Sequence, residues 1–214
     1  MQMYKNLIAI LALLTGLVMA LPALAQEDIE GKYITLKPAQ PTQTGNKIEV
    51  VEVFWYGCPH CYSFEPFLEA WLKTKPEDVE LVRVPGVLNQ QWIPHAKAYY
   101  TAEKLGIVEK IHQPLFDALH KEKKTIYTDE QLKDFFASHG VPAGEFAKTY
   151  TSPEVEAKIR QAYFLARDYK LTGVPSIVVN GKYLTSATHA GSFDYLINVV
   201  NALIERERQA SPAD

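Results

Sequence analysis

Residues 54–62 read Phe54-Trp55-Tyr56-Gly57-Cys58-Pro59-His60-Cys61-Tyr62 and include both cysteines of the chain. The run from Lys47 to Tyr56 is rich in β-branched and aromatic residues, which is typical of a buried strand. After the cysteines, apolar residues recur at helical spacing from Phe64 to Leu72. The two cysteines are therefore predicted to lie where a strand ends and a helix begins.

The spacing of the cysteines predicts a reversible disulfide. If Cys58 caps the helix and Pro59 is its first residue, where a missing N–H costs nothing, Cys61 lies one turn further along. Residues three apart on a helix have Cβ atoms about 5–6 Å apart, within reach of a disulfide. The unpaired N–H groups at the helix start favour a thiolate at Cys58, and a protonated His60 adds positive charge. Cys58 is thus predicted to be the attacking or attacked sulfur, and Cys61 the more shielded, resolving partner.

A second motif, Thr172-Gly173-Val174-Pro175, leads into an apolar strand-like run. Together with the Phe-Trp-Tyr-Gly-Cys-Pro-His-Cys segment it resembles the DsbA family of periplasmic thiol:disulfide oxidases, and the resemblance covers nearly the whole mature chain. It implies a thioredoxin-like α/β fold with an inserted all-helical domain. It also implies a cis Val174–Pro175 bond that faces the disulfide, with the Val174 backbone free to pair with an incoming chain.

Glu52 is an anomaly on the strand predicted at 47–56, because its carboxylate shares a face with apolar residues. A buried carboxylate without a partner is costly and tends to stay protonated. We interpret Glu52 as a proton acceptor or donor for Cys61, matching the acid that thioredoxin-like proteins carry at this place. The alternative is an edge position reached by water. Arg83, on the next predicted strand, is a candidate partner.

The first residues predict a secretory signal peptide. Lys5 precedes an apolar run from Leu7 to Leu21, and the small-residue pattern Ala23-Leu24-Ala25 closes it. This run is shorter than the roughly 20 residues that a membrane span needs. We expect cleavage after Ala25 and a mature protein in the periplasm.

Composition and patterning predict the domain organisation. The chain has 214 residues, of which 47% are hydrophobic and 22% charged, which suits compact domains with a sizeable core. We expect a thioredoxin-like domain in two parts, residues 26–87 and 171–208, split by a helical insertion at 88–170 and followed by a polar tail at 209–214. The formal net charge of -3 provides no basic surface of the kind that binds nucleic acid. We also expect a monomer. Four histidines of the insertion, His95, His112, His120 and His139, lack ligand spacing and are interpreted as ordinary core or surface residues.

The expected function is disulfide donation to newly exported proteins with free thiols, through a mixed disulfide at Cys58. An unfolded segment would lie against the apolar surface near Trp55, His60 and Val174-Pro175. The redox group is the Cys58–Cys61 disulfide itself, so we expect no cofactor and no metal. By resemblance, a DsbB-like membrane quinone reductase reoxidises the pair.

Two other functions remain open at this level. The first is a disulfide isomerase or reductase of the same fold, although the bacterial isomerases carry an N-terminal dimerisation domain that residues 26–47 are too short to form. The second is a metal-binding module with Cys58 and Cys61 as soft ligands. That module would need a third and a fourth ligand, and the sequence shows none at recognisable spacing.

Overall fold

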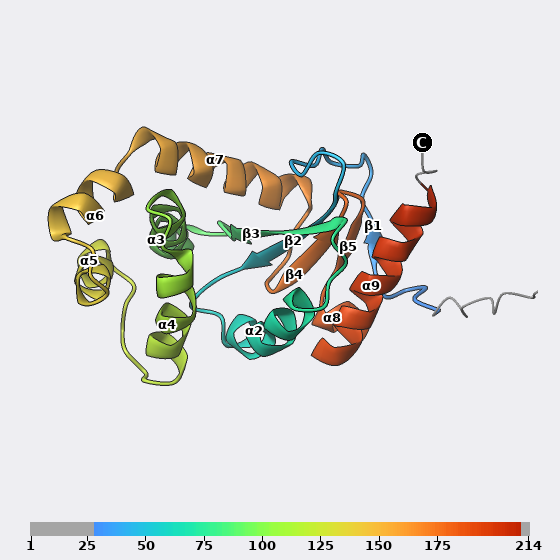
Figure 1. Ribbon diagram of the computed structural model, residues 1–214, viewed down its shortest axis with the longest axis horizontal. Helices are drawn as coiled ribbons and strands as arrows, with labels where there is room; N and C mark the ends of the chain where they lie inside the picture. Colours follow the sequence, from blue (N-terminus) through green and yellow to red (C-terminus); the bar gives the residue numbers. More distant parts are fainter. Residues whose placement is uncertain (1–27, 211–214) are drawn as a thin grey trace, which may run out of the picture.

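The computed structural model describes residues 28–210. The predicted signal peptide, residues 1–25, and the last four residues of the predicted tail lie outside them. Within the described part, five strands form one mixed sheet in the order β1-β5-β4-β2-β3 (Figure 1). The strands are β1 (Ile34–Thr35), β2 (Ile48–Phe54), β3 (Val79–Pro85), β4 (Ser176–Val179) and β5 (Tyr183–Thr185).

Helices interrupt and follow this sheet along the described part of the chain. Between β3 and β4 the chain forms only helices, and these gather at one end of the molecule (Figure 1). They are η1 (Gln90–Trp92), α3 (Ile93–Lys104), α4 (Val108–His120), α5 (Asp129–Ser138), α6 (Ala143–Tyr150) and α7 (Pro153–Asp168). The others are α2 (Pro59–Leu72), α8 (Ala187–Ala190) and α9 (Phe193–Ala210). None of the helices described here is both long and apolar enough to cross a membrane.

Strand β2 is an interior strand of the sheet, paired on both edges, as its buried sequence predicts. It pairs in parallel with β3 and antiparallel with β4, and the residues from Glu49 to Phe54 are buried. The register places Glu52 opposite Arg83 on one side and Ile177 on the other. Because β2 is paired on both edges, the water-exposed alternative for Glu52 is wrong.

Apolar side chains cover both faces of the sheet. On one face, Phe64 and Leu68 of α2 pack with Val50 of β2 and Leu196 of α9. The opposite face packs against the helices inserted between β3 and β4. Phe54, the last residue of β2, packs near Tyr99 of α3 and Phe116 of α4.

Local signals in the sequence set several element boundaries. The sequence Thr128-Asp129-Glu130-Gln131 predicts a capping box, which is present with Gln131 as the partner of Thr128, and Ser152 caps α7. The dipeptide Asn180-Gly181 predicts a tight turn, and these residues, with φ of 49° and 63°, form one between β4 and β5. Helix α9 continues to Ala210, two residues into the predicted tail.

Candidate active site

The two cysteines lie at the start of α2, where the sequence places them. Cys58 is the N-cap residue with extended backbone angles (φ −90°, ψ 116°), and Pro59 is in the first turn. Both cysteines are free thiols, and Cys61 is fully buried whereas Cys58 is 8% exposed. Pro59 and His60 are exposed beside them. Only Cys58 is therefore open to attack, as the predicted roles require.

The helix start makes the two sulfurs electrostatically unequal. The pKa of Cys58 is lowered to about 6, chiefly by a hydrogen bond from the Cys61 thiol and further by the backbone N–H groups of Cys61 and His60. The positive charge of His60 lowers that pKa in addition. Burial raises the pKa of Cys61 well above its usual range, and the neighbouring Cys58 sulfur raises it further. One sulfur is thus a thiolate near neutral pH while the other holds its proton.

The segment before β4 faces the exposed sulfur. The Val174–Pro175 peptide bond is cis, as the resemblance implies, and the Cys58 thiol lies 3.5 Å from the carbonyl oxygen of Val174. A groove of about 590 Å³ begins here and is lined by His60, Val174, Pro175, Leu184, His189 and Phe193, among others. Three of the four residues expected to contact substrate therefore lie together along one groove.

Trp55, the fourth of these residues, lies elsewhere. Its indole stacks on Trp92 with ring centroids 4.6 Å apart, and it does not line the groove. Its ring also fills the space beside Gly57, where a Cβ atom would overlap the indole. Glycine is therefore required at position 57 by the close approach of Trp55 rather than by an unusual φ.

A buried cluster of charges lies behind the cysteines. Arg83 donates from Nε to Glu52 at 3.2 Å and from Nη2 to Glu65 and Glu69 at 3.5 and 2.6 Å. Glu52 and Glu65 are 0% and 2% exposed. Burial raises the pKa of Glu52, the nearby Glu65 raises it further, and Arg83 offsets only part of this. Glu52 in turn is one of the charges that raise the pKa of Cys61.

Sequence reasoning identified Arg83 as a partner of Glu52 and missed Glu65. A signal was available, because Glu65 is four residues after Cys61 and so lies on the same buried face of α2. The sequence analysis interpreted His112 as an ordinary core or surface histidine, and it is buried in the core. Its contacts with other side chains were not predicted. Its Nδ1 is 2.9 Å from the Tyr56 hydroxyl and its Nε2 is 3.4 Å from Oε1 of Glu65.

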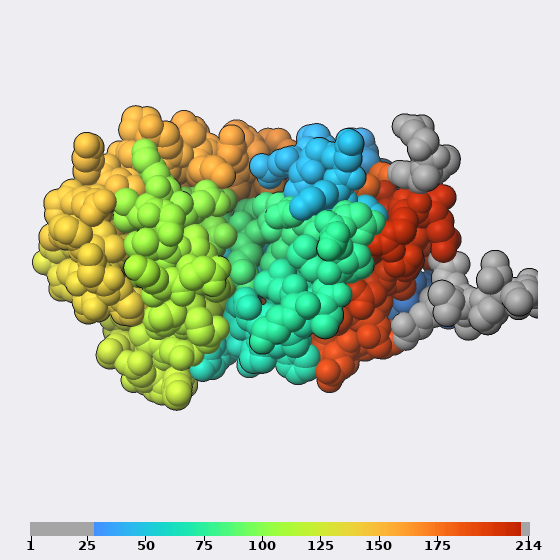
Figure 2. Space-filling model, viewed as in Figure 1, coloured from blue at the N-terminus to red at the C-terminus, as the bar shows by residue number. Residues whose placement is uncertain are grey.

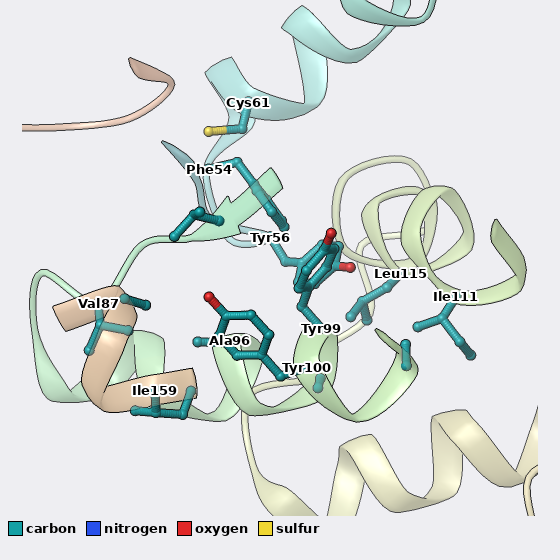
Figure 3. Close-up of a cluster of buried hydrophobic side chains, with 14 of the residues drawn as sticks. Phe54, Tyr56, Cys61, Val87, Ala96, Tyr99, Tyr100, Ile111, Leu115 and Ile159 are labelled. Atoms are coloured by element: carbon teal, nitrogen blue, oxygen red, sulfur yellow. The ribbon is translucent and has the colours of Figure 1, made fainter. Parts of the chain in front are cut away.

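Tyr56 joins the cysteine segment to the inserted helices. Its ring is fully buried and packs against Phe116 of α4, and its carbonyl oxygen lies 2.7 Å from Nε2 of His120. Figure 3 shows Tyr56 and Phe54 in the buried cluster whose edge is formed by Cys61. The segment that follows β2 is therefore fixed in place by contacts with α4 as well as by its connection to the sheet.

Comparison with known proteins identifies the family. A family model described as a DSBA-like thioredoxin domain matches residues 83–198, more than half of the chain. The thiol:disulfide interchange protein DsbA of Pseudomonas syringae pv. tomato is 39% identical over 211 residues, which cover 98% of this chain and 99% of the relative. The chain belongs to the DsbA family. The DsbA of Azotobacter vinelandii is 42% identical over 186 residues, 87% of each protein.

Solved structures of DsbA agree with the fold described above. The crystal structure of Pseudomonas aeruginosa DsbA has a TM-score of 0.80 at 40% identity and covers 84% of this chain and 94% of that chain. The oxidoreductase DsbA from Xylella fastidiosa has a TM-score of 0.78 at 34% identity, covering 83% and 96%. The predicted thioredoxin-like fold with inserted helices is thereby confirmed.

As a DsbA-family member that carries Cys58 and Cys61 at the start of α2, the chain is a protein thiol:disulfide oxidoreductase. The redox group of the family is the cysteine pair itself. Within residues 28–210, no three or more His, Cys, Asp or Glu side chains are arranged to hold a metal ion.

Proposed function

We propose that this DsbA-family protein donates its Cys58–Cys61 disulfide to newly exported proteins with free thiols. The observation that carries the proposal is the contrast between the sulfurs, because the pKa of Cys58 is lowered to about 6 while that of Cys61 is raised. Stabilising one thiolate of the reduced pair lowers the free energy of the dithiol relative to the disulfide. The disulfide is then readily passed on.

The exchange begins at the accessible sulfur. A substrate thiolate attacks Cys58, the Cys58–Cys61 bond breaks, and its electron pair leaves on Cys61. The second substrate thiol then attacks the mixed disulfide, so that the substrate leaves oxidised and the protein remains as a dithiol. Cys61 is buried, which supports a role as the partner sulfur rather than as the site of attack.

Glu52 is proposed as the group that protonates Cys61 when it leaves and deprotonates it on reoxidation. Its raised pKa keeps a proton available near neutral pH, and its electrostatic effect on Cys61 supports proximity of the two groups. Burial is the main cause of that raised pKa, Glu65 raises it further, and Arg83 lowers it. Glu52 is thus assigned a proton-transfer role, and Cys58 is the sulfur that the substrate thiolate attacks.

The groove beside Cys58 is proposed to hold an unfolded segment of the substrate. His60 and Val174 line it next to the reactive sulfur, and apolar side chains such as Leu184 and Phe193 line it further away. The carbonyl of Val174 is released for a substrate N–H when the Cys58 thiol is consumed in the mixed disulfide. Trp55 is given no direct contact with substrate, since it does not line this groove.

The setting of the reaction follows from the family. We infer a periplasmic protein that acts on exported chains, reoxidised by a DsbB-like membrane quinone reductase and active as a monomer. The predicted signal peptide, with cleavage after Ala25, supports export. The pairing of Cys58 with an accessible groove suits a protein partner in both half-reactions.

A disulfide-transfer assay tests the proposal. Oxidised protein beginning at Gln26 is mixed with a reduced, unfolded protein that has two cysteines, and both are followed by mass shift after thiol alkylation. We expect the substrate to gain one disulfide as the oxidoreductase loses one. Equilibration with glutathione buffers should show a strongly oxidising pair, and a strongly reducing pair would contradict the assignment.

A further inference from the structure

The groove beside Cys58 contains basic side chains but no carboxylate. His60, Lys170 and His189 contribute two imidazoles and one ammonium group to its lining. None of the described residues that line the groove is Asp or Glu, and Asp194 of α9 does not line it. A bound segment therefore meets no carboxylate there.

This distribution of charge differs from that of the chain as a whole, in which 25 Asp and Glu outnumber 22 Lys and Arg. Four other openings in the described part of the chain each contain both a carboxylate and a basic group. In two of them the opposite charges bond directly, from Arg83 to Glu69 at 2.6 Å and from Arg208 to Asp78 at 2.8 Å. The groove beside Cys58 is the exception among these five openings.

Lys170 supplies the permanent charge of the groove. It follows the end of α7 by two residues, with left-handed backbone (φ 55°), and it is exposed. Among residues 28–210, no carboxylate lies within 4.0 Å of its ammonium group. Lys170 can therefore pair with a carboxylate of a bound segment without first giving up an ion pair within the protein.

His189 is held with a hydrogen-bond donor available. Ser186 Oγ accepts from the backbone N–H of His189 at 3.4 Å and lies 2.9 Å from its Nδ1. When the hydroxyl donates to Nδ1, the proton of the neutral imidazole is on Nε2, which has no partner among the described residues. The imidazole can then donate to a carboxylate.

The fold brings these side chains together from distant parts of the sequence. His60 belongs to α2, Lys170 to the segment after α7, and His189 to α8. Figure 2 shows the segment of α2, in teal, beside the orange-red segment of α8 and α9. Phe64 of α2 and Phe193 of α9 contact each other there, with ring centroids 5.3 Å apart. Three separate elements thus give one groove its basic character.

We propose that the groove beside Cys58 selects unfolded segments that carry Asp or Glu two residues from the cysteine to be oxidised. The inference rests on the disulfide donation proposed above. Side chains two residues apart in an extended segment point to the same side, so the carboxylate and the cysteine face the groove together. Lys170 determines this specificity through its charge, and His60 and His189 add hydrogen-bond donors. A segment with Lys or Arg at the same place finds no carboxylate to pair with.

Two peptides of opposite charge test this selection. Both are reduced, rich in Gly and Ser, and contain two cysteines, each flanked two residues away on either side by Asp in one peptide and by Lys in the other. The rate of oxidation by the oxidised protein is divided by the rate with the neutral reagent hydroxyethyl disulfide, which corrects for the reactivity of each peptide thiol. At low ionic strength we expect a corrected rate about fivefold higher for the Asp peptide, and a smaller ratio in high salt.

Variants of Lys170 identify the cause of the preference. Lys170→Glu should reduce the ratio to one or below, whereas Lys170→Arg should keep it. Lys123→Glu is the matched control and should also keep it, because Lys123 is likewise exposed and left-handed (φ 59°) after a helix but does not line the groove.

The same rates separate this inference from the function on which it rests. Equal corrected rates for the two peptides, a ratio that salt does not change, loss of the ratio in Lys170→Arg, or equal effects of Lys170→Glu and Lys123→Glu would each overturn the selection. As long as both peptides are oxidised, the proposed disulfide donation stands. If neither peptide is oxidised, the proposed function fails and the inference fails with it.

Discussion

The thiol of Cys58 lies 3.5 Å from the carbonyl oxygen of Val174, although the two residues are 116 positions apart in the chain. One belongs to the start of α2 and the other to the segment before β4, and the pairing of β2 with β4 brings the two segments together. The inserted helices connect β3 to β4 in sequence without separating the two motifs in space. The reactive sulfur and the proposed substrate-pairing backbone thus share one site.

Replacing each cysteine by serine should give different products. Cys58→Ser removes the more accessible sulfur of the cysteine pair and should abolish disulfide transfer. Cys61→Ser keeps the attacked sulfur but removes its intramolecular partner, so mixed disulfides with substrate should accumulate. Non-reducing electrophoresis of reactions with an unfolded substrate distinguishes the two. Equal and mild losses from both variants would contradict the assigned roles.

The stability of the reduced protein relative to the oxidised protein should rise with pH over a defined range. A cysteine in an unfolded chain has a pKa of about 8.5, whereas the pKa of Cys58 in the folded protein is about 6. Because the folded state loses this proton first, the stabilisation is present above the unfolded pKa and is lost as the pH falls through about 6. Above that range, the raised pKa of Cys61 acts in the opposite direction.

Urea unfolding of both redox forms between pH 5 and pH 9 measures this effect. This range includes the pKa of Cys58 in the folded protein and in the unfolded chain. The oxidised form is the control because its sulfurs do not titrate. A difference in unfolding free energy that stays constant with pH would rule out a stabilised Cys58 thiolate.

Glu52→Gln should slow disulfide exchange while the protein stays folded. The amide keeps the shape of the side chain but cannot transfer a proton to Cys61. Glu49→Gln is a matched control, because Glu49 is also a buried carboxylate of β2 but bonds the backbone N–H of Gln43. Stopped-flow kinetics with circular dichroism checks both variants. Equal rates for the two would leave Glu52 with a structural role only.

Gly57→Ala should destabilise the protein through its neighbour Trp55. The added Cβ would overlap the indole, and overpacking of this kind costs about 1–3 kcal/mol. Gly173→Ala is the control in the facing segment, because a Cβ there meets no described atom within 4 Å. Urea unfolding and tryptophan fluorescence report the effect. A Gly57→Ala protein as stable as Gly173→Ala would show that the indole moves aside freely.

Much of the fold can be predicted because its signals are local. The strand before Cys58, the cap at Thr128 and the turn at Asn180 each depend on neighbouring residues, and each is confirmed. The cysteine site is equally predictable, since a helix start and a spacing of three residues define it.

The buried charge cluster and the groove depend on tertiary contacts and are harder to foresee. Arg83 meets Glu52 through strand register, but its contacts with Glu65 and Glu69 require the packing of α2 on the sheet. His112 reaches Glu65 only because α4 lies beside α2. Trp55 was predicted to lie near bound substrate, and its stacking on Trp92, outside the lining of the groove beside Cys58, was not foreseen.

The most direct test of the account is a titration of Cys58 in the reduced protein by the ultraviolet absorbance of its thiolate, with the oxidised protein as blank. We expect a transition near pH 6, and a shift to higher pH in Cys61→Ala, because the hydrogen bond from Cys61 is the largest cause of the lowered pKa. A transition near the ordinary thiol value of about 8.5 would contradict the claim that the start of α2 holds a stabilised thiolate.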